Sequence, residues 1–93
     1  MIFKPPAPTE NYIRYPEEMI TFPISDGAFV TYIQLATVKN LHEATKKELV
    51  EHTGITLVTL NKRLKELVDN GILIPQEGKG FKYNPKYAAE YFE

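Results

Sequence analysis

Residues 45–76 read TKKELVEHTGITLVTLNKRLKELVDNGILIPQ, and this stretch decides the fold. Thr45 and Glu48 have the spacing of a capping box, in which the two residues satisfy each other's free amides, so a helix is expected to begin there. It should stop near Thr53 and Gly54, because glycine readily takes the left-handed conformation of a helix exit. One short helix is therefore predicted over about residues 45–53.

A second helix is predicted from Leu57 to Asn70, with Thr56 as its cap and Gly71 at its exit. Apolar residues recur along it at the period of a helix with one buried edge. That edge consists of Leu60, Leu64, Leu67 and Val68. The opposite face carries Val58, Asn61, Lys62 and Lys65, with Leu57 and Thr59 near its N-terminal end. We interpret this face as the side that the helix presents to a partner.

The residues after Gly71 change from helix-forming to strand-forming and turn-forming types. Residues 72–74 are a short β-prone run, and residues 81–83 alternate apolar with polar as a returning strand. Between them, Glu77-Gly78-Lys79-Gly80 has the composition of a turn. A β-hairpin that ends before Pro85 is therefore expected directly after the second helix.

Upstream, residues 1–24 are predicted to form an extended N-terminal arm, and residues 25–93 the domain that follows. Prolines 5, 6 and 8 argue against a helix near the start, while residues 12–23 indicate an irregular or short-strand segment packed on the core. Another helix is expected from the cap Ser25 to about Lys39, where Asn40 ends it. Its inward stripe is Phe29, Tyr32, Ile33, Leu35 and Ala36, and Thr31, Gln34 and Thr37 are expected outside.

The C-terminal segment is unusually aromatic for its length. Tyr87, Ala88, Tyr91 and Phe92 stand at helical spacing after Pro85. Two interpretations fit this pattern. The segment forms a homodimer interface, for which the large faces and polar tips of tyrosine are suited, or it is a helix that covers the core.

Composition narrows the class of protein. With 43% hydrophobic and 25% charged residues, the 93-residue chain is expected to fold as one domain. It has no cysteine and no apolar run long enough for a secretory signal or a membrane span, so we expect no membrane association and a cytoplasmic location. The net charge is −1, yet residues 46–86 carry eight basic and five acidic groups, a local excess of +3.

Catalysis is not expected from this sequence. Glu48 and His52 share a helix face at a spacing of four, but two side chains fall short of a zinc site, and His42 lies outside that helix. Residues 77–80 are too short and wrongly placed for a phosphate loop of the Walker type. We therefore predict no catalytic residue, metal or cofactor.

Two short helices joined by a glycine-containing turn, followed directly by a hairpin, resemble the winged helix-turn-helix family of DNA-binding domains. The resemblance covers residues 45–76 and implies a mainly α fold with a small β-hairpin. The N-terminal arm is also loosely similar to the N-terminal domains of plasmid replication initiators and phage replisome organisers. The implied partner is double-stranded DNA, in transcription regulation, replication or plasmid transfer.

The resemblance also implies roles for individual residues, since the start of the helix predicted from Leu57 to Asn70 would enter the major groove. Asn61 would pair with adenine, Thr59 would hydrogen-bond to base edges, and Leu57 or Val58 would pack on a thymine methyl. Lys62 and Lys65 would reach phosphates or guanine. The free amides near Thr45 and Thr56 would hold phosphates. Lys79 and Lys82 would carry the contacts of the wing, with Gly78 and Gly80 letting the turn approach the duplex.

Each of these roles has an alternative. Lys62, Lys65 and Lys79 also fit a solvated surface, and Leu57 and Val58 also fit a protein contact or the core. Tyr12, Arg14 and Tyr15 fit either a minor-groove arm or packing across the first helix. A protein-interaction module that keeps the winged fold is therefore the second hypothesis for the whole domain.

Overall fold

Helices dominate the fold, which the computed structural model describes for residues 2–3 and 12–92. The α-helices are α1 (Asp26–Leu35), α2 (Lys46–Thr53) and α3 (Leu57–Asp69). Strands β3 (Leu73–Pro75) and β4 (Phe81–Tyr83) form a hairpin after α3. Strands β1 (Ile2–Phe3), β2 (Tyr12–Arg14) and β5 (Glu90–Phe92) form a second, antiparallel sheet in the order β1-β2-β5. Three short 3-10 turns complete the described chain: η1 (Glu17–Thr21), η2 (Leu41–Glu43) and η3 (Pro85–Tyr87).

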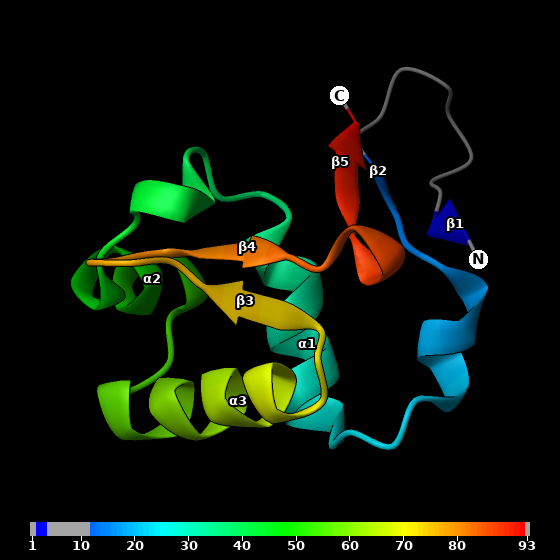
Figure 1. Cartoon of the computed structure of the whole chain (residues 1–93), viewed down its shortest axis with the longest axis horizontal. Helices are drawn as coiled ribbons and strands as arrows, with labels where there is room; N and C mark the ends of the chain where they lie inside the picture. The colour runs from blue at the N-terminus through cyan, green and yellow to red at the C-terminus, as the bar shows by residue number, and fades with distance from the viewer. Residues whose placement is uncertain (1, 4–11, 93) are drawn as a thin grey trace.

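The hairpin extends from α2 at one end to the sheet of β2 and β5 at the other (Figure 1). Its tip is beside α2, and its other end leads through η3 to β5, which pairs with the N-terminal strand β2. The core residues Leu49, Leu60, Leu64 and Leu67 come from α2 and α3, and Ile72 and Leu73 follow from the start of the hairpin. The predicted buried edge of the third helix is confirmed, with Val68 half-buried at its margin.

Helix α1 begins where the sequence predicted and ends earlier. The Ser25 hydroxyl accepts a hydrogen bond from the Ala28 amide, which confirms the cap. The helix stops at Leu35 rather than near Lys39, because Thr37 draws the last turn tight: its amide and its hydroxyl both donate to the Gln34 carbonyl. Asn40 does not end α1 but precedes η2, in a left-handed conformation with φ 53°.

Thr31 was expected on the outside of α1, and this prediction is wrong: its side chain is fully buried. Helix α3 packs against this part of α1, and the Arg63 Nη1 atom donates to the Thr31 hydroxyl at 3.4 Å. Gly27 permits that approach, since a Cβ there would lie 2.8 Å from the Arg63 Nε. Thr31 therefore faces α3 rather than solvent.

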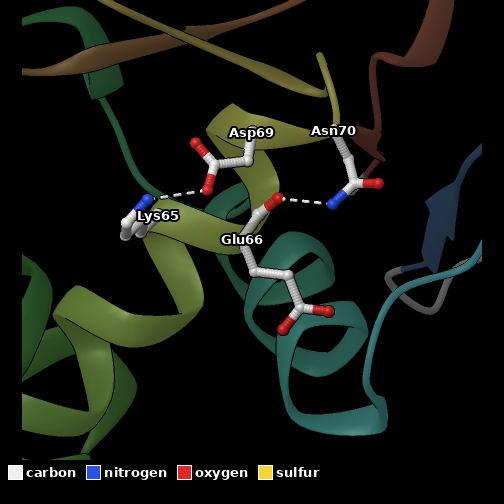
Figure 2. A network of polar contacts seen from close by, with 4 residues as sticks. All are labelled: Lys65, Glu66, Asp69 and Asn70. Atoms are coloured by element: carbon white, nitrogen blue, oxygen red, sulfur yellow. Dashed lines mark hydrogen bonds and ion pairs between the residues drawn. The ribbon is translucent and has the colours of Figure 1, made fainter.

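A second contact fixes α3 to the start of α1. The Glu66 carboxylate accepts hydrogen bonds from the Ser25 amide at 2.6 Å and from the Ser25 hydroxyl at 2.8 Å. Figure 2 shows Glu66 pointing from α3 toward α1, away from Lys65 and Asp69. Hydrogen bonds to a charged acceptor are stronger than neutral ones, so this pair adds to the packing that holds α3 against α1.

An aromatic cluster joins the N-terminal segment to α1 and the hairpin. Tyr15 packs edge-on against Phe29 and Tyr32, and Tyr32 packs edge-on against Tyr83. Tyr15 and Met19 are buried, which confirms that the segment after β2 packs on the core, and favours packing over a groove-binding arm for Tyr15. Prolines 5, 6 and 8, used to predict an extended start, lie outside the described residues.

Two tyrosine hydroxyls tie the C-terminal segment to this cluster. The Tyr32 hydroxyl donates to the Tyr87 carbonyl, and the Tyr83 hydroxyl donates to the Tyr32 carbonyl. Burial raises the pKa of both hydroxyls, with smaller contributions from Tyr15 to Tyr32 and from Tyr32 to Tyr83. Both groups therefore stay protonated as donors at neutral pH.

The helical spacing of the last aromatic residues did not produce a helix. One 3-10 turn, capped by the Asn84 side chain, gives way at Ala88 to extended backbone, and β5 then pairs with β2. A helix of so few residues is unstable by itself, whereas the edge of β2 offers backbone hydrogen-bond partners. The interpretation as a helix over the core is thus wrong.

Candidate nucleic-acid interface

The turn between α2 and α3 has the local geometry that the sequence predicted. The Thr45 hydroxyl accepts from the Glu48 amide at 3.2 Å, and the Glu48 carboxylate accepts from the Thr45 amide at 3.0 Å. Gly54 ends α2 with φ 74°, and the Thr56 hydroxyl caps α3 by accepting from the Thr59 amide. The starts of both helices and the end of α2 are therefore fixed by residues within their own terminal turns.

The two helix starts differ as places for a phosphate. At α2 the Glu48 carboxylate already occupies the amide end, so an incoming anion near Thr45 would meet a negative charge. The first turn of α3 contains no acidic residue, and among the described residues the Thr56 hydroxyl bonds to Thr59 alone. Of the two predicted phosphate contacts, the one near Thr56 is electrostatically the better.

The pH dependence of the α2 cap follows from these contacts. Hydrogen bonds from the Thr45 amide and hydroxyl, and then the charge of Lys79, lower the pKa of Glu48 from its ordinary value of 4.5. A carboxylate with a lowered pKa stabilises the fold above pH 4.5, and this contribution is lost as the pH falls through the folded-state pKa. Thr45→Ala should raise the pKa of Glu48, as measured by NMR titration of its carboxyl carbon. Thr56→Ala, which removes the other threonine cap, should leave it unchanged.

The outward face of α3 presents an apolar pair followed by charged residues. Val58 is 66% exposed and Leu57 50% exposed, and Lys62 and Lys65 are also exposed one and two turns further on. Lys65 pairs with Asp69, with 2.8 Å between Nζ and Oδ2 (Figure 2). The hydrogen bond and the charge of Asp69 raise the pKa of Lys65. Asp69 thus offsets part of the positive charge of this face.

Thr59 and Asn61 lie at the borders of that face rather than on it. Both are half-buried, and the Oδ1 atom of Asn61 is buried and has no hydrogen-bond partner among the described residues. Successive helical residues are separated by about 100°, so Asn61 stands much closer to the buried Leu60 direction than Val58 does. Asn61 must turn its amide outward before it can pair with a base edge.

The hairpin places its two candidate lysines differently. Lys82 is exposed and lies opposite Ile74 in the strand register, on the outer face of the hairpin. Lys79 is at the tip, where it lines a hollow of about 290 Å³ together with Lys46 of α2. Lys46 was not among the residues predicted from the sequence. The sequence held one sign of such a role: two lysines, Lys46 and Lys47, stand in the first turn of α2, where the helix dipole disfavours positive charge.

Gly80 has a structural role that differs from the predicted one. It is buried, and a Cβ at this position would lie 2.2 Å from the carbonyl oxygen of His42 in η2. Gly78 has open space around it and a φ of 90°. Gly80 therefore lets the hairpin pack on η2, and only Gly78 stays available for approach to a duplex.

Other features of the described chain give no sign of a metal centre. The His52 Nε2 atom contacts the Thr37 hydroxyl at 2.6 Å, which joins the end of α2 to the exit of α1. Within residues 2–3 and 12–92, histidine and acidic side chains nowhere gather in groups of three or more suited to a metal. Over the same residues, every helix is too short or too polar to cross a bilayer.

Comparison with protein-family models, with curated proteins and with solved structures found no match to this chain.

Proposed function

We propose that this protein binds double-stranded DNA as a winged helix-turn-helix domain, with α3 in the major groove and the β3–β4 hairpin as the wing. The observation that carries the proposal is the outward face of α3. Helix α3 follows another helix and a tight glycine turn, and it precedes a hairpin. The other described residues leave Leu57 and Val58 on its outward face uncovered. An α-helix fits the major groove, where base edges can be read.

The distribution of charge supports the same surface. Lys62 stands one turn after Val58, and Lys79 and Lys46 flank the hollow beside the hairpin tip. Lysines at these places would contact phosphates on either side of the groove, and such contacts position a protein on DNA without reading its sequence. Thr59 and Asn61, at the border of the face, would add hydrogen bonds to base edges.

The proposal covers transcription regulation, replication and plasmid transfer alike, because one surface serves all three. The position of the binding site separates these processes. A single site in a promoter indicates regulation, whereas repeated sites in an origin indicate initiation of replication or transfer. Footprinting on the DNA that surrounds the gene for this chain distinguishes them.

A salt titration tests the proposal. We expect the chain to bind a mixed-sequence duplex at low salt and to lose affinity steeply between about 50 and 200 mM salt, because phosphate contacts release counterions. Lys62→Ala and Lys79→Ala should each reduce the slope of log affinity against log salt by about one. Lys86→Ala is the matched control. Lys86 lies in η3, which follows the end of the hairpin away from its tip, and the slope should not change.

No binding at low salt, or binding that salt does not weaken, would refute the proposal. Equal slopes for the wild type, Lys62→Ala and Lys79→Ala would show that the contacts lie elsewhere. Fluorescence anisotropy of a labelled duplex measures all four proteins under one set of conditions.

A protein-interaction module on the same scaffold is the second candidate. The exposed Leu57 and Val58, the Lys65–Asp69 pair and the net charge of −1 favour it. It predicts no salt-dependent affinity for duplex DNA. A homodimer through the C-terminal segment is less well supported, because β5 already pairs with β2, although Tyr91 is 37% exposed.

A further inference from the structure

A hollow of about 270 Å³ lies between η1 and the start of α1, and we name it the η1–α1 hollow. Its lining includes Tyr15, Met19, Ile20, Phe22, Asp26 and Phe29. In Figure 1, η1 lies at the right-hand end of the longest axis, whereas α2 and the tip of the hairpin lie at the left-hand end. An occupant of the η1–α1 hollow would therefore leave the hairpin tip and the start of α3 free.

Aromatic and aliphatic side chains dominate the lining of the η1–α1 hollow. Tyr15 and Met19 are buried, Phe22 and Phe29 are half-buried, and Ile20 is 48% exposed. Open faces of aromatic rings attract cations, because the ring quadrupole places negative charge there. The volume is below about 300 Å³, where pockets for drug-sized ligands begin, so it suits a single side chain.

Asp26 brings a carboxylate without a partner to the η1–α1 hollow. It is exposed, and its side chain forms no hydrogen bond or ion pair with the described residues. The start of α1 already has another acidic partner, since the Glu66 carboxylate accepts from both the amide and the hydroxyl of Ser25. A helix N-terminus is equivalent to only about half a positive charge. Asp26 therefore adds negative charge beyond what the end of the helix can balance.

The surroundings of the η1–α1 hollow are acidic as well. None of the described residues that line it is basic. Residues 15–38 contain no lysine, arginine or histidine, and their acidic residues are Glu17, Glu18 and Asp26. Arg63 of α3 comes close to the start of α1, but it does not line the hollow. The charge at this end of the molecule thus favours an occupant that is positively charged.

We propose that the η1–α1 hollow binds an arginine side chain of a partner protein, with the guanidinium on the Asp26 carboxylate and the aliphatic stem against the aromatic lining. A guanidinium suits this combination better than an ammonium. It is more weakly hydrated, it stacks on aromatic rings, and it can bind a carboxylate through two hydrogen bonds. Buried arginines commonly anchor larger protein interfaces. This inference does not depend on the proposed DNA binding.

Methionine labelling gives a direct signal from the η1–α1 hollow. Met1 and Met19 are the only methionines of the chain, so a sample labelled at its methionine methyl carbons gives an NMR spectrum that is simple to assign. Met19→Leu identifies the signal from the hollow. Titration with the end-blocked tripeptide Gly-Arg-Gly should move this signal and reach saturation. The same tripeptide with citrulline, the neutral isostere of arginine, should bind more weakly.

Asp26→Asn should lower the affinity for the arginine tripeptide by about twofold to fivefold, the effect of one exposed ion pair. It should leave the affinity for the citrulline tripeptide unchanged, because that peptide has no charge to lose. Glu43→Gln is the matched control. It neutralises an exposed acidic residue in the first turn of η2 instead of α1, and both affinities should stay at their wild-type values. Circular dichroism checks that each variant is folded.

Three results would overturn the proposal. The first is an arginine tripeptide that leaves the Met19 signal in place up to its solubility limit, even if free butylguanidinium moves it, since the hollow would then take only a small molecule. The second is equal affinity of the arginine and citrulline tripeptides. The third is equal affinity of the wild type and Asp26→Asn for arginine. None of these results bears on DNA binding, which the salt titration decides separately.

Discussion

Gly80→Ala is expected to destabilise the fold by more than about 3 kcal/mol, because a left-handed conformation and a backbone collision act together. The φ of Gly80 is +83°, and the added Cβ would lie 2.2 Å from the His42 carbonyl oxygen. That atom belongs to the backbone of η2, so it cannot rotate away as a side chain would. The hairpin must then separate from η2. Urea denaturation followed by circular dichroism measures the loss.

Gly78→Ala is the matched control, since it differs from Gly80→Ala only in the available space. Gly78 has a φ of +90°, and an added Cβ there would meet nothing within 4 Å. Its expected cost is therefore the conformational one alone, about 1–2 kcal/mol. Equal losses for the two variants would show that the contact of the hairpin with η2 is not a constraint. A smaller loss for Gly80→Ala would overturn the role assigned to it.

Leu60→Ala should destabilise the fold by about 2–5 kcal/mol, because it leaves a cavity in the core where α2, α3 and the hairpin meet. Leu60 is fully buried, with 0% of its surface exposed. The same substitution at Leu57, three residues earlier and half exposed, should cost no more than about 0.5 kcal/mol. Chemical denaturation of both variants gives the two values side by side.

The comparison also has a functional reading. If DNA binding holds, Leu57→Ala should keep the stability of the domain and weaken its contact with the duplex. Leu60→Ala should lower the stability of the domain, and the fraction that remains folded should keep its affinity for the duplex. A large stability loss for Leu57→Ala would mean that its side chain serves the core, and would remove it from the interface.

The predictions that the structure confirmed depend on interactions between near neighbours in the sequence. The capping box of Thr45 and Glu48, the cap Thr56, and the left-handed exits at Gly54 and Gly71 each depend on residues within one turn of each other. The buried edge of α3 was likewise predictable, because Leu60, Leu64 and Leu67 recur at spacings of three and four residues. The hairpin was also predicted, although its first strand begins at Leu73 rather than one residue earlier. These features needed no knowledge of distant parts of the chain.

Only part of the candidate interface could be predicted from near neighbours in the sequence. Helical spacing placed Val58, Lys62 and Lys65 on one exposed face. It did not show that the Asn61 oxygen is buried or that Lys46 shares a hollow with Lys79. Each of these depends on which neighbour a side chain meets, and a sequence period assigns a direction without naming that neighbour.

By itself, then, the sequence determined α2 and α3 with their ends, the start of α1, the hairpin and the exposed side of α3, because short-range hydrogen bonds and periodic burial act between near neighbours. Tertiary structure alone decided that Thr31 is buried beneath α3, that Gly80 lies against η2, and that the C-terminal residues pair with β2 as a strand. In all three cases the controlling partner is distant in the chain. The contact exists only once the whole core has assembled.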